Sequence, residues 1–190
     1  VQFDSPVQEV KLQFGSEEYA MEKVGETYTA SQRASNASIY NLKFTDTSGN
    51  AYLSDLYALE LLRDESPKIE IQGLPQFSSF EYEDEQILEF ITVINDDYAV
   101  AEAYIIATVS KGSGESVKFR EEKLGFETRI EKGSKNLELR KRLNLKSLKM
   151  EPGDELYFYV EAKDFKTPKA NVGRTETYFS VIKDTTTNGF

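Results

Sequence analysis

The sequence predicts an all-β protein of two similar β-sandwich modules, and three observations lead to this fold class. Apolar and polar residues alternate with a period of two through most of the chain, as they do in strands that bury one face. Clusters of Gly, Pro, Asn and Asp separate these segments as turns do. Three stretches of the first half recur in the same order in the second half. The 190 residues suit one large domain or two small ones.

The clearest strands lie in the second half of the chain. In residues 136–145, four leucines share one face of the predicted strand and mostly polar residues share the other. Lys141 falls on the apolar face, which predicts an edge strand or a bulge at that point. Residues 87–94 are apolar on both faces, as in a central strand. The segments 69–71, 87–94, 99–109, 117–124, 136–145, 156–162 and 174–181 give about seven strands, spaced as in a β-sandwich.

The first third of the chain follows the same period less strongly. Val10, Leu12 and Phe14 alternate with polar residues. Residues 53–62 fit either a helix or a strand, and the internal repeat favours the strand. Strands at 19–24 and 26–30 are expected to pair around Gly25. The remaining predictions are a strand at 39–44 and turns at 46–50, 111–114 and 151–154.

The internal repeat consists of three short matches in a fixed order, which is the usual mark of tandem modules. Two unrelated β-sandwich halves can share such patterns as well, so the duplication is a hypothesis. The matches join residues 4–10 to 97–103, residues 40–46 to 158–164, and residues 57–64 to 178–184.

The repeat divides the chain into a first module, residues 1–66, and a complete second module of about seven strands, residues 67–190. Two predicted strands precede Asp97 in the second module, whereas three residues precede its match, Asp4. The first module is therefore expected to be either a smaller variant or truncated. In the second case a sheet edge would remain exposed, and self-association through that edge is expected.

The composition argues against most catalytic chemistry. The chain has no His and no Cys, which excludes Ser-His-Asp triads, Cys-His pairs, ordinary zinc sites and disulfides. We therefore expect no enzyme, no catalytic or cofactor-binding residues and no cofactor. A hydrolase that uses paired carboxylates is the remaining enzymatic alternative, and nothing marks out one pair among the 33 acidic residues.

The charge and hydropathy patterns narrow the expected partners. A net charge of −10 repels nucleic acid and anionic lipid. Residues 111–150 are locally basic, with 12 Lys or Arg against 6 Asp or Glu, and solvated strand faces explain this as well as a basic binding face does. No apolar run is long enough to span a bilayer, so direct membrane insertion by this segment is not expected. The start at Val1 suggests a processed protein or an excised fragment.

Two groups of side chains are candidate binding residues. Calcium is bound by carboxylate oxygens, and the weak candidates for it are Asp64, Asp84, Asp96 and Asp97. No loop has the spacing of a dedicated calcium site. Solvated acidic turns are the alternative explanation of these residues. An aromatic surface that stacks on a sugar or a peptide is the second candidate, with cross-strand packing as its alternative. Its residues are Phe80, Tyr82, Tyr157, Tyr159 and Tyr178.

Four motifs carry a resemblance to a known family: the acidic run at 96–98, the strand and its turn at 153–164, the strand at 174–179, and the junction at 64–67. These resemble immunoglobulin-like repeats of large uncharacterised membrane-anchored envelope proteins of Gram-negative bacteria. The resemblance covers residues 67–184 well and residues 1–66 loosely. It implies two tandem immunoglobulin-like or fibronectin III-like β-sandwich modules and an extracytoplasmic location, in the periplasm or at the cell surface. It brings no catalytic residues.

The sequence therefore favours a non-catalytic extracytoplasmic structural or interaction module of a larger envelope protein, acting as a spacer, a scaffold or a protein-binding module. The expected partners are another protein or other domains of the parent protein. The alternative is a ligand-binding module for a glycan or for calcium-dependent adhesion.

Overall fold

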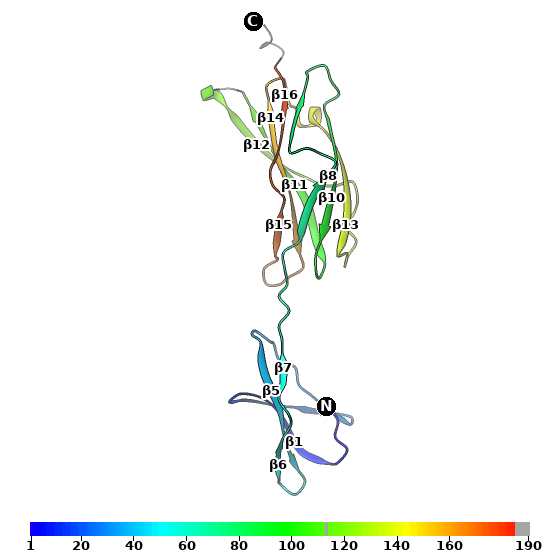
Figure 1. Ribbon diagram of the computed structural model, residues 1–190, viewed down its shortest axis with the longest axis vertical. Helices are drawn as coiled ribbons and strands as arrows, with labels where there is room; N and C mark the ends of the chain where they lie inside the picture. Colours follow the sequence, from blue (N-terminus) through cyan, green and yellow to red (C-terminus); the bar gives the residue numbers. More distant parts are fainter. Residues whose placement is uncertain (113, 185–190) are drawn as a thin grey trace. The chain divides into compact units, whose positions relative to one another are not determined.

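The computed structural model describes residues 1–112 and 114–184, in two compact units divided between Arg63 and Asp64 (Figure 1). In the described residues, the helical elements are two short 3₁₀ turns, η1 (Gly114–Ser116) and η2 (Leu145–Leu148), and all other regular structure is strand. The predicted all-β sandwich class is therefore confirmed. The division into tandem immunoglobulin-like modules at 1–66 and 67–190 stays a prediction, and residues 185–190 and Ser113 of the expected 111–114 turn lie outside the described chain.

The first unit, residues 1–63, contains one larger sheet and one small hairpin. The sheet has the strand order β2-β1-β5-β6, with β7 also paired to β5, while β3 pairs only with β4. The predicted pairing around Gly25 is the β3–β4 hairpin, and residues 53–62 contain no helix. The strands are β1 (Val7–Phe14), β2 (Glu17–Ala20), β3 (Glu22–Val24), β4 (Thr27–Thr29), β5 (Ser38–Asp46), β6 (Ala51–Leu53) and β7 (Tyr57–Leu59).

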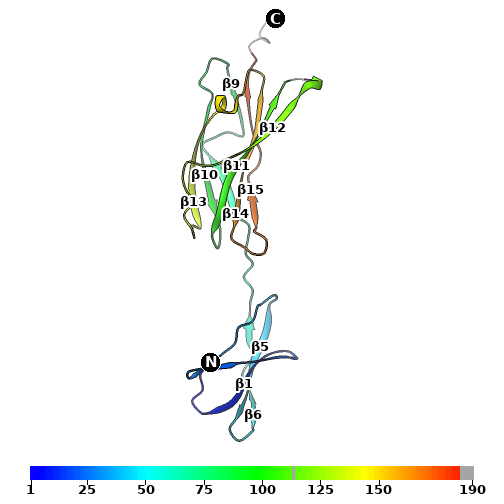
Figure 2. The same ribbon diagram turned by 180° about the vertical axis from the view of Figure 1, so that it is seen from behind.

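The second unit is a sandwich of two sheets (Figures 1 and 2). One sheet has the order β13-β10-β8, and the other has the order β12-β11-β14-β16-β9 with β15 paired to β14. Nine strands are described where about seven were expected. They are β8 (Lys68–Gln72), β9 (Phe77–Phe80), β10 (Ile87–Asn95), β11 (Val100–Lys111), β12 (Lys118–Leu124), β13 (Asn136–Asn144), β14 (Glu155–Asp164), β15 (Val172–Arg174) and β16 (Tyr178–Ile182).

The core of the second unit lies between its two sheets. Phe90 of β10 stacks on Phe158 of β14 with ring centroids 5.5 Å apart, and both are buried. Ile105 and Val160 pack around this pair, and Leu145 of η2 completes the same cluster. Burial of such apolar side chains is the main source of stability in a sandwich, since each contributes about 1.5–3 kcal/mol.

The two units share the same strand pairing at the positions that the repeat makes equivalent. In the first unit Val7 of β1 pairs with Asp46 of β5, and the register shifts directly after this pair. In the second unit Val100 of β11 pairs with Asp164 of β14, and the register shifts at the same place. β6 pairs with β5, and β15 with β14, at equivalent positions too. This shared geometry supports the duplication hypothesis.

In each unit a side-chain hydroxyl replaces one backbone acceptor in the strand pairing, at equivalent positions of β5 and β14. The Ser54 hydroxyl accepts a hydrogen bond from the Leu42 N–H at 2.8 Å, and the Thr175 hydroxyl accepts one from the Val160 N–H at 3.0 Å. These side chains take the place of a backbone carbonyl, so the strand ends beside them. The prediction of one strand over 174–181 is therefore wrong: the segment is divided between β15 and β16.

Two other features of the second unit depend on pairing between distant segments. β9 was not predicted, because its Phe-Ser-Ser-Phe sequence does not alternate, and it is held by parallel pairing with β16. The edge strand predicted from Lys141 is confirmed, since β13 lies at the edge of its sheet. The Lys141 ammonium donates to the Gly125 carbonyl at 2.7 Å and pairs with Glu127 at 3.1 Å.

Candidate functional site

The outer surface of the larger sheet carries a row of exposed rings, which we call the aromatic face. β14 alternates, so its even-numbered apolar side chains enter the core and Tyr157 and Tyr159 point to the other side. Phe179 stacks on Phe77 at 5.2 Å between ring centroids, and its ring lies tilted at 48° to that of Tyr157, 5.0 Å away. Phe119 on the neighbouring β12 is 71% exposed. The face therefore consists of Phe77, Thr108, Phe119, Tyr157, Tyr159, Thr177 and Phe179.

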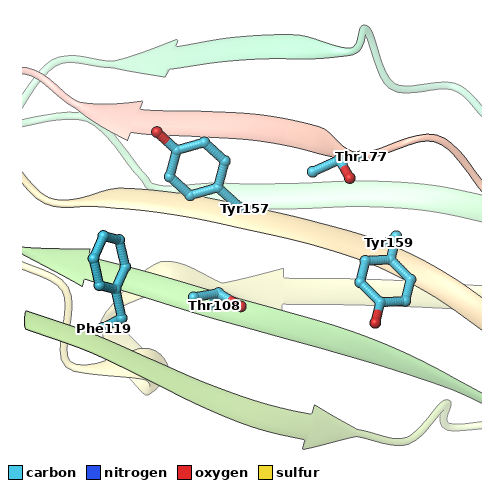
Figure 3. Close-up of a pocket in the computed structure, with 5 residues that line it drawn as sticks. All are labelled: Thr108, Phe119, Tyr157, Tyr159 and Thr177. Atoms are coloured by element: carbon cyan, nitrogen blue, oxygen red, sulfur yellow. The ribbon is translucent and has the colours of Figure 1, made fainter.

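A shallow depression of about 380 Å³ lies in the aromatic face. Figure 3 shows its lining, in which Tyr157 and Phe119 stand on either side of Thr108, and Tyr159 and Thr177 lie farther along the same surface. Rings with neighbouring hydroxyls offer both flat apolar area and hydrogen-bonding groups, which is the combination found at many protein interfaces and sugar sites.

The titratable groups at one edge of this face are held in structural pairs. The Tyr157 hydroxyl donates to Glu155 at 2.7 Å, and this hydrogen bond to a carboxylate raises the pKa of Tyr157 above its usual value. A tyrosine is already neutral at pH 7, and the raised pKa of Tyr157 only extends its neutral range upward. The phenol acts as a donor to its own neighbour on the strand and as a ring surface toward solvent.

A network of polar and charged side chains around the buried carboxylate of Glu161 lies beside the aromatic face on the same sheet. The carboxylate of Glu161, 6% exposed, accepts hydrogen bonds from the Tyr104 hydroxyl and from Arg174 Nε. The Lys123 ammonium lies 3.6 Å from the centre of the Tyr104 ring. Burial by itself would raise the pKa of Glu161. The hydrogen bonds from Tyr104 and Arg174 and the charges of Arg174 and Lys163 outweigh burial. The pKa of Glu161 therefore lies below its usual range. The ionised, fully paired carboxylate joins β11, β14 and β15.

The structure brings together only part of the predicted aromatic surface. Tyr157 and Tyr159 belong to the aromatic face, whereas Phe80 and Tyr178 pack against the core, where Tyr178 stacks on Phe158. Tyr82 is exposed in the turn that follows β9. The five residues therefore do not form one surface, because strand alternation sends them to opposite faces.

Sequence reasoning missed the other rings of the aromatic face, and one of them had a visible signal. Phe119 is the only aromatic residue in the charged sequence of β12. A single exposed phenylalanine is common on protein surfaces, so this signal gains weight only from the neighbouring rings of the aromatic face. Phe77 and Phe179 could not be found in this way, since their contact depends on the parallel pairing of β9 with β16.

Three of the four acidic candidates for calcium accept hydrogen bonds from backbone in their own turns or in the junction. The Asp96 carboxylate accepts from Ala99 N at 2.7 Å, and the Asp97 carboxylate accepts from Glu65 N at 3.4 Å. Asp84 accepts from Glu81 N at 3.3 Å. Asp84 precedes β10 and Asp96 follows it, so a nine-residue strand of roughly 30 Å separates them.

Asp64 lies where negative charge collects. Burial raises its pKa, and the nearby charges of Asp164, Asp97 and Asp96 raise it further. One carboxylate oxygen of Asp64 and one of Asp96 are buried without a hydrogen-bond partner. Over residues 1–112 and 114–184, however, no three acidic side chains are placed to hold a metal ion together. Calcium binding at Asp64, Asp84, Asp96 and Asp97 stays a prediction, and Asp164 is a neighbour that the sequence analysis did not include.

Comparisons with known proteins assign neither a family nor a function to this chain. No family model and no curated protein matches the chain. Among solved structures, fibronectin(III)-like modules of CbhA from Clostridium thermocellum are 14% identical, with a TM-score of 0.35, and cover 100% of this chain and 85% of theirs. A candidate carbohydrate binding protein from Bacteroides uniformis is 10% identical, with a TM-score of 0.32, over 94% of this chain and 89% of its own. At these TM-scores the fold description rests on the strand pairing above. A search of the described residues for an apolar helix long enough to cross a bilayer finds none.

Proposed function

We propose that this chain is a non-catalytic structural and interaction module of a larger extracytoplasmic envelope protein, and that the aromatic face is its contact surface for a protein partner. The envelope setting rests on the resemblance of its repeats to envelope modules. The contact surface rests on one observation: large rings stand exposed in a row across neighbouring strands, with Phe119 71% and Phe77 57% exposed.

Exposed aromatic side chains in contiguous rows are typical of protein interfaces. Tyr and Phe supply large buried areas at a small loss of side-chain entropy, and a few such residues carry most of the binding free energy. The face lies on a six-stranded sheet, so its side chains are held in place before a partner arrives. A rigid, flat and apolar surface of this kind suits a folded protein partner.

The groups beside the face favour binding over catalysis. The Glu155 and Glu161 carboxylates both accept hydrogen bonds from neighbouring side chains, and the pKa of Glu161 is lowered. A general acid or base works best with a pKa near the working pH and with access to its substrate. These carboxylates instead stabilise the strands that carry the rings.

A capture experiment with matched variants tests the contact surface. The purified chain, carrying a photo-crosslinker at Thr108, is incubated with envelope extract from the source cells. We expect a crosslinked protein that is lost in the double variant Phe119→Ser/Tyr157→Ser. Tyr98→Ser, which removes an exposed ring outside the face, should leave the crosslink unchanged. Equal yields from all three proteins would contradict a contact at this face.

Glycan binding is the second candidate, and the hydroxyls of Thr108 and Thr177 beside the rings of Tyr157 and Tyr159 favour it. Sugars commonly combine stacking on a ring with hydrogen bonds to nearby hydroxyls. A glycan array separates the two candidates. Binding to one class of glycan that is lost in Tyr157→Ser and kept in Tyr98→Ser would replace the protein partner with a carbohydrate.

A further inference from the structure

The register of the larger sheet arranges the aromatic face in adjacent rows that run across the strands. Residues directly opposite each other in paired strands present their side chains on the same face of the sheet, so the strand partners define each row. The two central rows are Glu121, Thr108 and Tyr157, and then Lys123, Ile106 and Tyr159. Each row therefore begins with a charged residue of β12 and leads to a tyrosine of β14.

The outward side of β12 presents charge of both signs. Its odd-numbered residues, Phe119, Glu121 and Lys123, are exposed, whereas its even-numbered residues are half-buried and Leu124 packs against the core. The ion pairs of this strand are those of Arg120 with Glu122 and of Lys123 with Glu102. Within residues 1–112 and 114–184, the outward carboxylate of Glu121 is therefore left without a cation.

The aromatic face is acidic at one end and basic at the other. Glu121 and Glu155 lie toward the end that carries Phe119, since Phe119 and Glu155 are both opposite Ser110. At the other end the basic side chains outnumber the carboxylates that pair with them. The basic residues are Lys123, Lys163 and Arg174, and the carboxylates are those of Glu102 and Glu161. A surface with this polarity is complementary to itself when it is turned end for end.

We infer that the protein partner of the aromatic face is a second copy of this chain, related to the first by a two-fold axis that lies between the two central rows and runs parallel to them. The inference rests on the proposed function and names its partner. The axis places Tyr157 over Tyr159 and Glu121 over Lys123, and symmetry makes each contact occur twice. A two-fold axis along the strands would instead place like charges over each other at both ends.

The rings supply the affinity of this contact and the charges set its orientation. Exposed Tyr and Phe side chains lose water when two such faces meet, and rings of this kind carry most of the binding free energy at interfaces. Two twisted sheets cross at about 30° when they pack face to face, and Glu and Lys side chains are long enough to follow that offset. An exposed ion pair adds little, whereas two like charges in contact oppose association strongly.

Sedimentation equilibrium of the full chain at low salt measures this association. We expect a dimer whose population rises with protein concentration. Glu121→Lys and Lys123→Glu should each weaken it by about tenfold or more, because each variant opposes like charges at both contacts. An equimolar mixture of the two variants should form a heterodimer of about wild-type affinity, since both contacts then join a carboxylate to an ammonium group.

Glu138 and Arg140 provide the matched control, because they too are exposed and two residues apart on an edge strand, β13 of the smaller sheet. Glu138→Lys and Arg140→Glu should leave the dimer unchanged. A dimer that neither β12 variant weakens, or one that mixing does not restore, would overturn the inference. A purified chain that stays monomeric would overturn it as well, and a crosslink from Thr108 to another envelope protein would then leave the proposed function in place.

Discussion

Residues 1–63 and residues 64–184 pair their strands in the same way but bury very different amounts of apolar side chain. Of the 21 buried apolar residues in the described chain, two belong to the first unit. Tyr40 and Phe158 hold equivalent positions, and only Phe158 is covered by a ring from a second sheet, that of Phe90. Strand pairing is thus set within each sheet, whereas a core requires a second layer placed over it.

Truncation of these two equivalent rings should give the largest difference between the units. Phe158→Ala removes a fully buried ring and should lower the free energy of unfolding of the second unit by about 3–5 kcal/mol. Tyr40→Ala removes a ring that borders an open groove and should cost the first unit about 1 kcal/mol or less. Hydrogen exchange measured along a urea series follows each unit separately.

Tyr57→Ala, the neighbour of Tyr40 in the same stack, is the matched control for the first unit. It should resemble Tyr40→Ala in its effect. A loss from Tyr40→Ala as large as that from Phe158→Ala would show that the first unit has a core of its own, and the contrast between the units would then disappear.

The second comparison concerns two aspartates that hold equivalent turns. Asp164 is buried and accepts hydrogen bonds from Lys166 N at 3.0 Å and from Asn171 N at 2.8 Å. Asp46 accepts two similar bonds from Ser48 N and Asn50 N, both at 2.9 Å, in an exposed turn. Asp164→Ala should cost about 1–3 kcal/mol, because partly buried donors lose their acceptor, and Asp46→Ala should cost less, because its turn is exposed. Urea unfolding measured at pH 7 checks this order.

The stability difference between the wild-type protein and Asp46→Ala should depend on pH. Backbone and side-chain hydrogen bonds from Asn50 lower the pKa of Asp46. A carboxyl whose pKa is lower in the folded protein contributes stability above its ordinary pKa of about 4 and loses it as the pH falls through the folded value. The difference between the wild-type protein and Asp46→Ala should therefore shrink below pH 4. A difference that grows on acidification would contradict the role of these hydrogen bonds.

The smallest expected change in stability comes from removing the charge of Asp64 in the acidic junction. This change should stabilise the protein, whereas the substitutions above destabilise it. Burial and the charges of Asp164 and Asp97 raise the pKa of Asp64. Ionised Asp64 therefore destabilises the folded protein at a pH above its folded pKa. This destabilisation disappears below about pH 4, where the carboxyl is protonated in both states. Asp64→Asn should therefore raise the urea midpoint of the second unit at pH 7 and leave it unchanged at pH 3. Glu83→Gln, which removes an exposed carboxylate, is the control.

The effect of calcium on thermal stability tests whether Asp64 belongs to a metal site. A cation bound only by the folded protein would raise the melting temperature. Melting in millimolar calcium and in chelator tests the predicted site, and equal melting temperatures in the two buffers would contradict it. A rise in the wild-type protein that is lost in Asp64→Asn would establish the calcium site that the sequence suggested.

Local patterns sufficed for much of the fold. Alternation located most strands, Gly25 marked the β3–β4 hairpin, and Lys141 marked the edge of its sheet. These features depend on a few neighbouring residues, whose side chains must point to one face or the other of a strand. The repeat even aligned Val7 with Val100, positions whose partners and register shifts coincide in the structure.

The candidate site was less predictable, because its residues meet only through long-range pairing. Phe77 reaches Phe179 through a parallel strand pair, and Asp164 reaches Asp64 because the junction lies against the end of β14. No pattern among neighbouring residues in the sequence indicates either contact. The same holds for Gly173, which is required by the passage of Pro67.

The sequence by itself determined most of the strands and turns and suggested the equivalence of the two halves, since period and turn residues act over short distances. Tertiary structure decided which of the alternating strands are covered by a second sheet. Phe90 of β10 covers the ring of Phe158, and both are buried. An alternating strand becomes part of a core only when a second layer excludes water from its apolar side, and that depends on the packing of segments far apart in the chain.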